Sequence, residues 1–169
     1  MHQTHNTLPE LVREHSAVLL NRHLAAAIDL QAQIRHAHWN VRGPGFIGVH
    51  KLFDTVSNDV GADADRIAER CAALGSDVGG TIQTAVAQSF LVPWNQKLAD
   101  VAHYGFAVSA VLAAFSQSAR EAAGRSATFG DSVTADLLED ICLRTDQNLW
   151  LVEANMAPHN DKTQDEAKV

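Results

Sequence analysis

The sequence predicts an all-α protein: a four-helix bundle with a short helix in the long crossover between its second and third helices. Three observations predict this fold. Four long segments repeat apolar residues every three or four positions, Gly- and Pro-containing stretches separate them, and no segment shows the alternating pattern of a β-strand. The 169 residues suit a single domain that can bury a core. We expect a short N-terminal tail at residues 1–6, the bundle at 7–156 and a flexible C-terminal tail at 157–169.

The first helix is expected to begin at Thr7, because Thr7 and Glu10 have the spacing of a capping box and Pro9 suits a first helical turn. It should end near Val41, since the following stretch RGPG (42–45) contains a proline and two glycines. The apolar residues expected on its buried face are Leu11, Val18, Leu24 and Ile28.

The second helix has the clearest helical period in the chain, and Gly75 is expected to end it. A region with several glycines follows, and we expect it to contain a short helix between Thr81 and Phe90. The residues of the apolar stripe are Phe46, Val49, Phe53, Val56, Val60, Ala64, Ile67, Cys71 and Leu74.

The third helix is expected to cover roughly Asn95 to Ala123 and to be broken by the stretch GRSATFGD (124–131). The fourth should run from about Ser132 to Asn155. Its cap is expected to be Asp131, because a carboxylate accepts well from the free N–H groups of a first turn.

The composition is that of an ordinary globular protein, with 46% hydrophobic and 20% charged residues. No apolar run approaches the roughly 18 residues of a membrane span, and the first ten residues lack the pattern of a secretory signal. Cys71 and Cys142 both fall in helical patterns, which suggests buried thiols in a reducing compartment. We therefore expect a cytoplasmic protein that does not associate with membranes.

Four polar residues of the second helix form a face of their own. His50 and Asp54 are four residues apart, as are Asp65 and Glu69. At about 100° per residue the four fall within about 100° of one another, and the apolar stripe is centred about 135° away. Such a face is either simply solvated or a set of metal ligands, because side chains at i and i+4 can converge on one ion. Imidazole and carboxylate ligands suit iron, manganese or zinc, and the share of oxygen favours iron or manganese.

The two pairs cannot meet within one chain, because about 15 residues of helix place them about 22 Å apart. Two copies related by a two-fold axis can bring them together. If the second helix lies antiparallel to its symmetry mate, His50 and Asp54 of one chain face the Asp65 and Glu69 positions of the other. The sequence therefore predicts a metal site that is shared across an interface.

His38 completes this set. If the first two helices form an antiparallel hairpin about the bend at 43–45, His38 lies as far before the bend as His50 lies after it. His36 points about 200° away from His38 and is expected to be structural. The same expectation holds for His15, His23 and His103.

The stretch HWNVRGPGFIGVHKLFD (38–54), with Asp65 and Glu69 in ADADRIAER, resembles the Dps family of mini-ferritins, the DNA-binding proteins from starved cells. The resemblance extends through TADLLEDICLRTDQNLWLVEANM (134–156) and so covers nearly the whole ferritin-like bundle. It implies a di-iron ferroxidase centre at the two-fold interface and a hollow dodecamer. Such a shell oxidises Fe(II), preferentially with hydrogen peroxide, and stores ferric mineral. The ligands implied are His38, His50, Asp54, Asp65 and Glu69.

The resemblance also implies roles beside the ligands. Trp39 would lie near the centre, where it either quenches stray oxidants or packs at the interface. Asn40 is expected only to hydrogen-bond at the helix end. Iron would be admitted through an acidic pore, for which the candidates are Asp131, Asp136 and Asp140, with Glu139 beside them. The alternative is that Asp131 is only a helix cap and the others are solvated.

DNA binding is doubtful at neutral pH, because the formal net charge is -7 and neither tail is basic. Residues 1–6 contain no Lys or Arg, and in 157–169 Lys162 and Lys168 stand against three acidic residues. His2, His5 and His159 could add positive charge only in acid. Two alternatives to an iron-oxidising storage enzyme stay open. One is a DNA-compacting stress protein with secondary iron chemistry, and the other is a helical shell whose site is idle or holds zinc or manganese.

Overall fold

Five helices make up most of the part of the chain that the structure, a computed structural model, describes: residues 1–94 and 98–156. There are four long helices, α1 (Glu10–Asn40), α2 (Phe46–Ala73), α4 (Val101–Phe129) and α5 (Ser132–Met156), and one short helix, α3 (Ile82–Gln88). No strand occurs within these residues. The all-α prediction is therefore confirmed, including the short helix in the long crossover.

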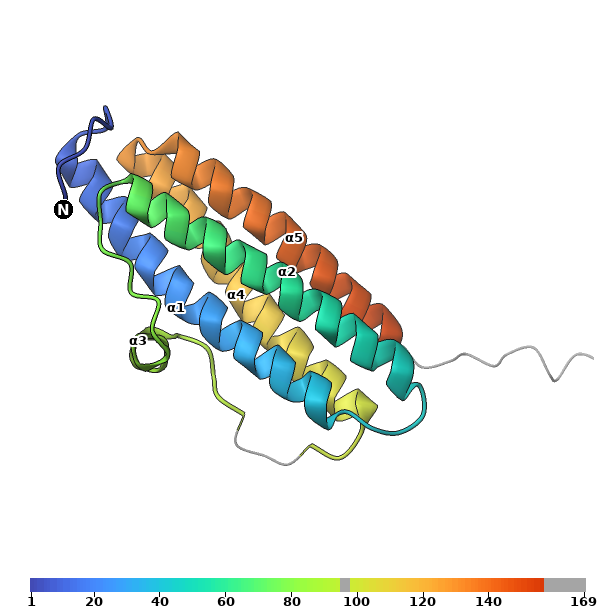
Figure 1. The fold of residues 1–169 in the computed structure, drawn as a ribbon. Helices are drawn as coiled ribbons and strands as arrows, with labels where there is room; N and C mark the ends of the chain where they lie inside the picture. Colours follow the sequence, from blue (N-terminus) through green and yellow to red (C-terminus); the bar gives the residue numbers. More distant parts are fainter. Residues whose placement is uncertain (95–97, 157–169) are drawn as a thin grey trace, which may run out of the picture.

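The four long helices form two antiparallel hairpins that pack against each other (Figure 1). The bend between α1 and α2 and the two residues between α4 and α5 make the hairpins, while the crossover from α2 runs back along the bundle past α3, which lies against α1. One long crossover in an otherwise up-and-down bundle is the topology of ferritin-like folds. It leaves one face of the α1–α2 hairpin uncovered by the second hairpin.

A single large apolar core lies between the hairpins. The predicted stripe of α2 faces it, so this prediction is confirmed, with Phe46 at its edge partly buried. The largest side chains that are fully buried are Phe53, Phe115, Leu20, Leu30, Ile34, Ile67, Leu74, Leu112, Leu138 and Ile141. In the part of the chain that the structure describes, no helix is long and apolar enough to cross a membrane.

The predicted start of the first helix is wrong. Helix α1 begins at Glu10 with Pro9 as its N-cap, and no side chain caps it. The Asn6 side chain accepts a hydrogen bond from the Leu8 backbone N–H, which keeps the preceding residues in a turn. The first helical bond therefore runs from the N–H of Arg13 to the carbonyl of Pro9, and Thr7 lies outside the helix.

Two of the four residues expected on the buried face of α1 are exposed. Leu24 is buried and Ile28 partly so, but Leu11 is 63% exposed and Val18 is 69% exposed. The stripe that faces the core is rich in alanine, so large apolar residues do not mark its period. It consists of Ala17, Leu20, Leu24, Ala27, Leu30, Ile34 and Ala37.

Both predicted ends of the third helix are wrong. Asp100 caps α4 by accepting from the His103 N–H at 3.1 Å, so the helix begins at Val101. Asn95, the predicted start, lies outside the described residues. At the other end α4 continues through Gly124 and stops only at Gly130, whose φ of 89° is left-handed. A single helical glycine costs only about 1 kcal/mol, which packing of the surrounding turns offsets.

The remaining boundaries agree with the predictions. Gly75, with φ of 84°, follows the end of α2, and α3 lies between Thr81 and Phe90. Helix α5 begins at Ser132, and the Asp131 carboxylate accepts from the Thr134 N–H at 3.0 Å.

Candidate metal centre

The end of α1 and the start of α2 bring His38 and His50 together. The α1–α2 turn is made possible by Gly43 and Gly45, whose φ values of 119° and 77° favour glycine. Across this turn the two imidazole rings stack with centroids 3.7 Å apart and planes 22° apart. The expectation that the hairpin places these residues side by side is confirmed.

Reciprocal hydrogen bonds orient both rings. Nδ1 of His38 lies 2.8 Å from the backbone oxygen of His50, and Nδ1 of His50 lies 2.8 Å from the backbone oxygen of His38. A carbonyl can only accept, so each Nδ1 carries the proton and donates. In the neutral ring the lone pair is then on Nε2. Both histidines are thus held in the form that ligates a metal through Nε2, with the other nitrogen bonded to backbone.

Asp54 lies one turn after His50 on α2, and its carboxylate is bound by a cation of its own chain. Nη1 of Arg35 on α1 donates to Oδ1 of Asp54 at 2.5 Å, and Nη2 lies 3.4 Å from Oδ1 of Asn58. The Asp54 side chain is 47% exposed and the Arg35 side chain 31% exposed. Asp54 is therefore accessible but paired.

Asp65 and Glu69 lie on the last three turns of α2, and both are exposed. Within residues 1–94 and 98–156 neither makes a hydrogen bond or an ion pair. Asp63, two residues before Asp65, behaves differently: it is buried, and Arg66 and Arg144 lie 3.3 and 3.2 Å from its Oδ1. Burial raises the pKa of Asp63 against the opposing effect of these arginines. Asp63 therefore joins α2 to α5, while Asp65 and Glu69 are left facing outward.

One chain does not assemble a metal site from these residues. Among the described residues, no three His, Cys, Asp or Glu side chains are grouped closely enough to hold an ion. The candidates form two separate groups along α2, with His38, His50 and Asp54 near its start and Asp65 and Glu69 near its end. This is the division that the sequence spacing predicts for a single chain.

Trp39 follows His38 and is 71% exposed. It lines a hollow of about 450 Å³ between α1 and α3, together with Arg35. The rest of the lining is mainly apolar and consists of Ile28, Asp29, Gln31, Ala32, Ile82, Ala85 and Val86. An indole beside aliphatic side chains at an open surface is typical of residues that become covered on association.

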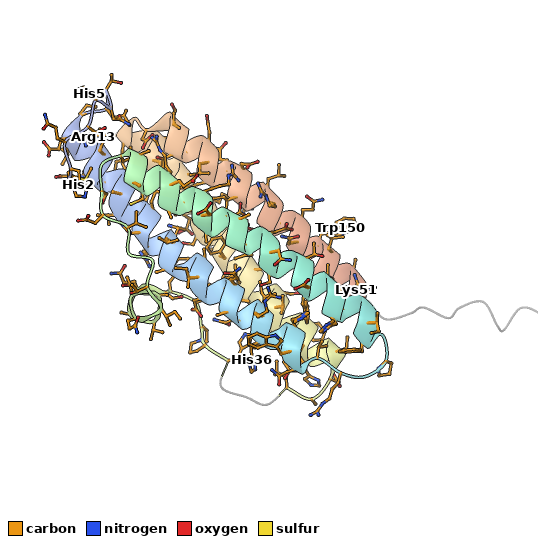
Figure 2. The ribbon with its side chains drawn as sticks, in the orientation of Figure 1. His2, His5, Arg13, His36, Lys51 and Trp150 are labelled. Carbon is orange, nitrogen blue, oxygen red and sulfur yellow. The ribbon has the colours of Figure 1, made fainter. Side chains whose placement is uncertain are left out.

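The histidines that we expected to be structural have partners outside the candidate centre. His36, labelled in Figure 2, lies edge-on to Trp94. His15 packs on Phe129, and His103 contacts Asp100 at 2.8 Å. His23 is buried between α1 and α4, and burial lowers its pKa despite hydrogen bonds to Leu19 and Ser118. Asn40 donates to the His36 carbonyl at 2.8 Å, as expected of a residue at a helix end.

The acidic residues considered for a pore lie in different environments. Asp131 is fully buried, capping α5 and bonding Nη2 of Arg70 at 2.7 Å. Asp136 and Glu139 are exposed on α5. Asp140 is also exposed, but Arg66 lies 2.7 Å from its Oδ2. The cap predicted for Asp131 is thus present.

Arg35 is the functional candidate that the sequence reasoning missed. It precedes His38 by three residues, so it lies on the same face of α1 and can reach the ligand face of α2. This three-residue spacing between Arg35 and His38 was the only sign in the sequence that Arg35 lies near the candidate ligands. Arginine is not a metal ligand, so the spacing of the candidate ligands does not point to it.

Comparison with known proteins identifies the family. The Ferritin-like domain family matches residues 17–157. A DNA protection during starvation protein of Agrobacterium fabrum is 32% identical over 155 residues, covering 92% of this chain and 96% of its own. The chain belongs to the Dps family.

Solved structures of the family agree with the fold. Mycobacterium smegmatis Dps superposes with a TM-score of 0.88 at 26% identity, covering 98% of this chain and 97% of that one. Its tetragonal crystal form gives a TM-score of 0.87 at 28% identity and covers 92% and 95%. DpsC from Streptomyces coelicolor gives 0.87 at 25% identity, covering 92% and 91%. The Dps bundle is therefore reproduced over nearly the whole chain.

Proposed function

We propose that this protein is an iron-storage and detoxification protein with ferroxidase activity. Its centre would be a di-iron site shared by two subunits, and its product a ferric mineral inside a hollow shell. The observation that carries the proposal is the histidine pair, whose reciprocal Nδ1 hydrogen bonds leave both Nε2 atoms without a hydrogen bond in the described residues. Asp54 follows His50 by one helical turn. The Dps and ferritin-like families are known in general for iron storage and DNA protection.

The second half of the site would come from a partner. Asp65 and Glu69 are exposed and have no partner in the described part of the chain, and the centres of the two groups are about 22 Å apart along α2. An isologous dimer with antiparallel α2 helices would join each His38–His50–Asp54 group to the second group of the other subunit. Each dimer would then contain two identical sites.

Exposed apolar side chains next to the site support such an interface. Trp39, Ile82 and Val86 all line the hollow between α1 and α3, and each is more than two-thirds exposed in the single chain. Further exposed apolar residues, such as Trp150 on α5 in Figure 2, offer surface for the other contacts of a larger assembly. We expect a dodecamer built from two-fold dimers.

The chemistry proposed for the site is a two-electron oxidation. Two Fe(II) ions give up one electron each, one peroxide accepts both, its O–O bond breaks, and two protons complete two waters. The imidazoles and carboxylates of this chain would hold the two substrate ions together, and hard oxygen ligands favour the Fe(III) that forms. Because both electrons pass to the same peroxide, hydroxyl radical is not released.

Other features would serve this activity in the cytoplasm. Trp39 could intercept stray oxidants near the site, and exposed Asp136 and Asp140 on α5 could line an acidic pore that admits iron. The buried Asp131 would contribute to such a pore only through the position of α5.

Protection of DNA by binding to it is the second candidate function, since the Agrobacterium relative is named a DNA protection during starvation protein. The tails do not support it at neutral pH. Residues 1–6 contain no Lys or Arg. The ring Nε2 of His2 lies 2.8 Å from Oδ1 of Asp77, and the backbone N–H of His2 donates to the Gly75 carbonyl, so His2 is held against the bundle. We expect no salt-sensitive gel shift of duplex DNA at pH 7 and moderate salt.

The experiment that tests the proposed activity is anaerobic loading with Fe(II), followed by matched additions of hydrogen peroxide or oxygen while ferric absorbance is recorded. We expect fast oxidation with about half a peroxide per iron, by the electron balance above, and slow oxidation with oxygen. A rate no faster than that of free Fe(II) would reject the activity and favour an idle, zinc or manganese site. Asp54→Ala and Glu69→Ala should each nearly abolish the fast phase.

A further inference from the structure

We propose that Arg35 is a built-in competitor for the metal: its guanidinium occupies Asp54 in the metal-free protein and must be displaced, so that it lowers the affinity of the site for divalent cations. The inference rests on the proposed function, because it takes Asp54 as a ligand. It concerns a residue outside the five ligand candidates.

The five candidate ligands are not equally ready for a metal. His38 and His50 present Nε2 atoms that make no hydrogen bond in the described residues, and Asp65 and Glu69 are exposed without partners there. Asp54 alone is bound by a cation of its own chain, at 2.5 Å. Of the five candidate ligands, only Asp54 must therefore lose an ion pair within its own chain when a metal binds.

The pair is well placed to be exchanged. Charge-assisted hydrogen bonds from a guanidinium are strong and directional, yet this one is partly exposed, where ion pairs contribute little net stability. The contact from Nη2 to Asn58 is long, at 3.4 Å, and adds little to the hold on the side chain. A divalent cation with two imidazoles and further carboxylates can thus outcompete it.

The displaced side chain has alternative partners beside the site. Arg35 lines the hollow of about 450 Å³ between α1 and α3 together with Trp39 and with Asp29, whose carboxylate also accepts from Gln33 and Ser89. A guanidinium can pair with this carboxylate and stack on the indole. If Arg35 instead stayed on Asp54, its positive charge would lie within a few ångströms of the bound dication and repel it. Both arrangements make Arg35 reduce metal affinity.

An alternative role predicts the opposite sign. If Arg35 merely oriented Asp54 toward the metal, removing it would weaken metal binding, as the loss of a partner to a ligating carboxylate does. If Arg35 only joined α1 to α2, removing it would lower the melting temperature of the metal-free protein without changing its metal affinity.

The test uses the assembled full-length protein and Zn(II) as a redox-silent probe, with calorimetry and thermal melting with and without the metal. Zn(II) binding at the candidate site is defined as the part of the calorimetric signal that is lost in Asp54→Asn. We expect Arg35→Gln to strengthen this component roughly three- to ten-fold, the range of a partly exposed ion pair plus the removal of one like charge. We also expect a lower melting temperature without metal and a larger rise with it. Arg35→Lys, which keeps the charge, should bind within about two-fold of the wild type.

The outcomes separate this inference from the proposed function. Arg35→Gln with unchanged or weaker Zn(II) binding overturns the competitor role and leaves the ferroxidase proposal intact, provided Asp54→Asn removes a component. If the wild type and Asp54→Asn bind Zn(II) alike, the ligand assignment itself fails, and the role of Arg35 fails with it.

Discussion

His38 and His50 are each oriented by the backbone of the other, rather than by a carboxylate. The carbonyl of His38 belongs to the last turn of α1, where it has no helical partner, and the Nδ1–H of His50 satisfies it. This one hydrogen bond satisfies the end of α1 and also fixes the tautomer of a candidate ligand. The bend between the helices and the proposed metal site depend on the same two residues.

Asp131 is a residue whose charge should stabilise the fold. Burial alone would raise its pKa, but hydrogen bonds from Thr134 and the charge of Arg70 outweigh this effect and hold the pKa below the ordinary 3.8. A carboxyl with a lowered pKa stabilises the native state above the ordinary pKa, and this contribution is lost as the pH falls through the lowered value.

We predict that Asp131→Asn costs about 2 kcal/mol at pH 7, because asparagine keeps the cap but loses the charged bond to Arg70. The difference from the wild type should shrink steadily below pH 3.8. Unfolding by urea at fixed protein concentration, from pH 7 to pH 2, measures it. Glu139→Gln, on the exposed side of the same helix, should change stability by less than about 0.5 kcal/mol. A difference that does not depend on pH would argue against the ion pair.

Trp39 provides a prediction about association. If its indole is covered at the two-fold interface, Trp39→Phe should assemble like the wild type, while Trp39→Asp should place a charge in an apolar contact and release smaller species. Sedimentation velocity distinguishes the two variants. Normal assembly of Trp39→Asp would show that the exposed indole is not part of a subunit contact.

At the scale of the helix, two glycines near the end of α4 have opposite roles. Gly124 is helical and exposed, and a Cβ added there would meet nothing within 4 Å. Gly130 has equally open surroundings, but its φ of 89° is left-handed. The sequence motif GRSATFGD contains both, which is why the break was expected too early.

We predict that Gly124→Ala stabilises the protein by about 0.5–1 kcal/mol, because alanine restricts the unfolded chain and suits a helix. Gly130→Ala should destabilise it by about 1 kcal/mol, since alanine disfavours the left-handed conformation. Thermal or urea unfolding of the two variants side by side tests this. Changes of the same sign would contradict the assigned helix end.

Helical period and turn chemistry predicted the fold class, the α1–α2 bend, the stripe of α2 and the cap of α5. These signals gave wrong predictions where a nearby side chain formed a different hydrogen bond, and where small residues rather than large apolar ones face the core. The Asn6 side chain accepts from the Leu8 N–H where a helix capped by Thr7 was expected, and an alanine-rich stripe, rather than Leu11 and Val18, faces the interior. The placement of His38 beside His50 followed from counting residues about the bend, although the stacking of their rings was not predicted. The ion pair of Arg35 did not follow from such counting, because side-chain pairing between helices leaves no periodic mark.

At the scale of the molecule, α2 carries residues of both halves of the candidate site but cannot bring them together within one chain. The first group of ligands lies near the start of α2 and the second near its end, and no cluster of three ligands forms within the described residues of one chain. Activity should therefore depend on association, and dissociated subunits should have none.

Co-assembly of two inactive variants tests this central claim most directly. Asp54→Ala damages the first group and Glu69→Ala the second, so a mixed dimer rebuilds one of its two sites. With random mixing in equal amounts, half of the dimers are mixed, and about a quarter of all sites should be intact. Subunit exchange is verified by native mass spectrometry, and peroxide-dependent Fe(II) oxidation is then measured.

The matched control pairs Asp54→Ala with His50→Ala, which both damage the first group, so that no mixed dimer contains an intact site. The shared-site account predicts about a quarter of wild-type activity for Asp54→Ala with Glu69→Ala and none for the control pair. No recovery in the first mixture, despite verified exchange of subunits, would contradict it.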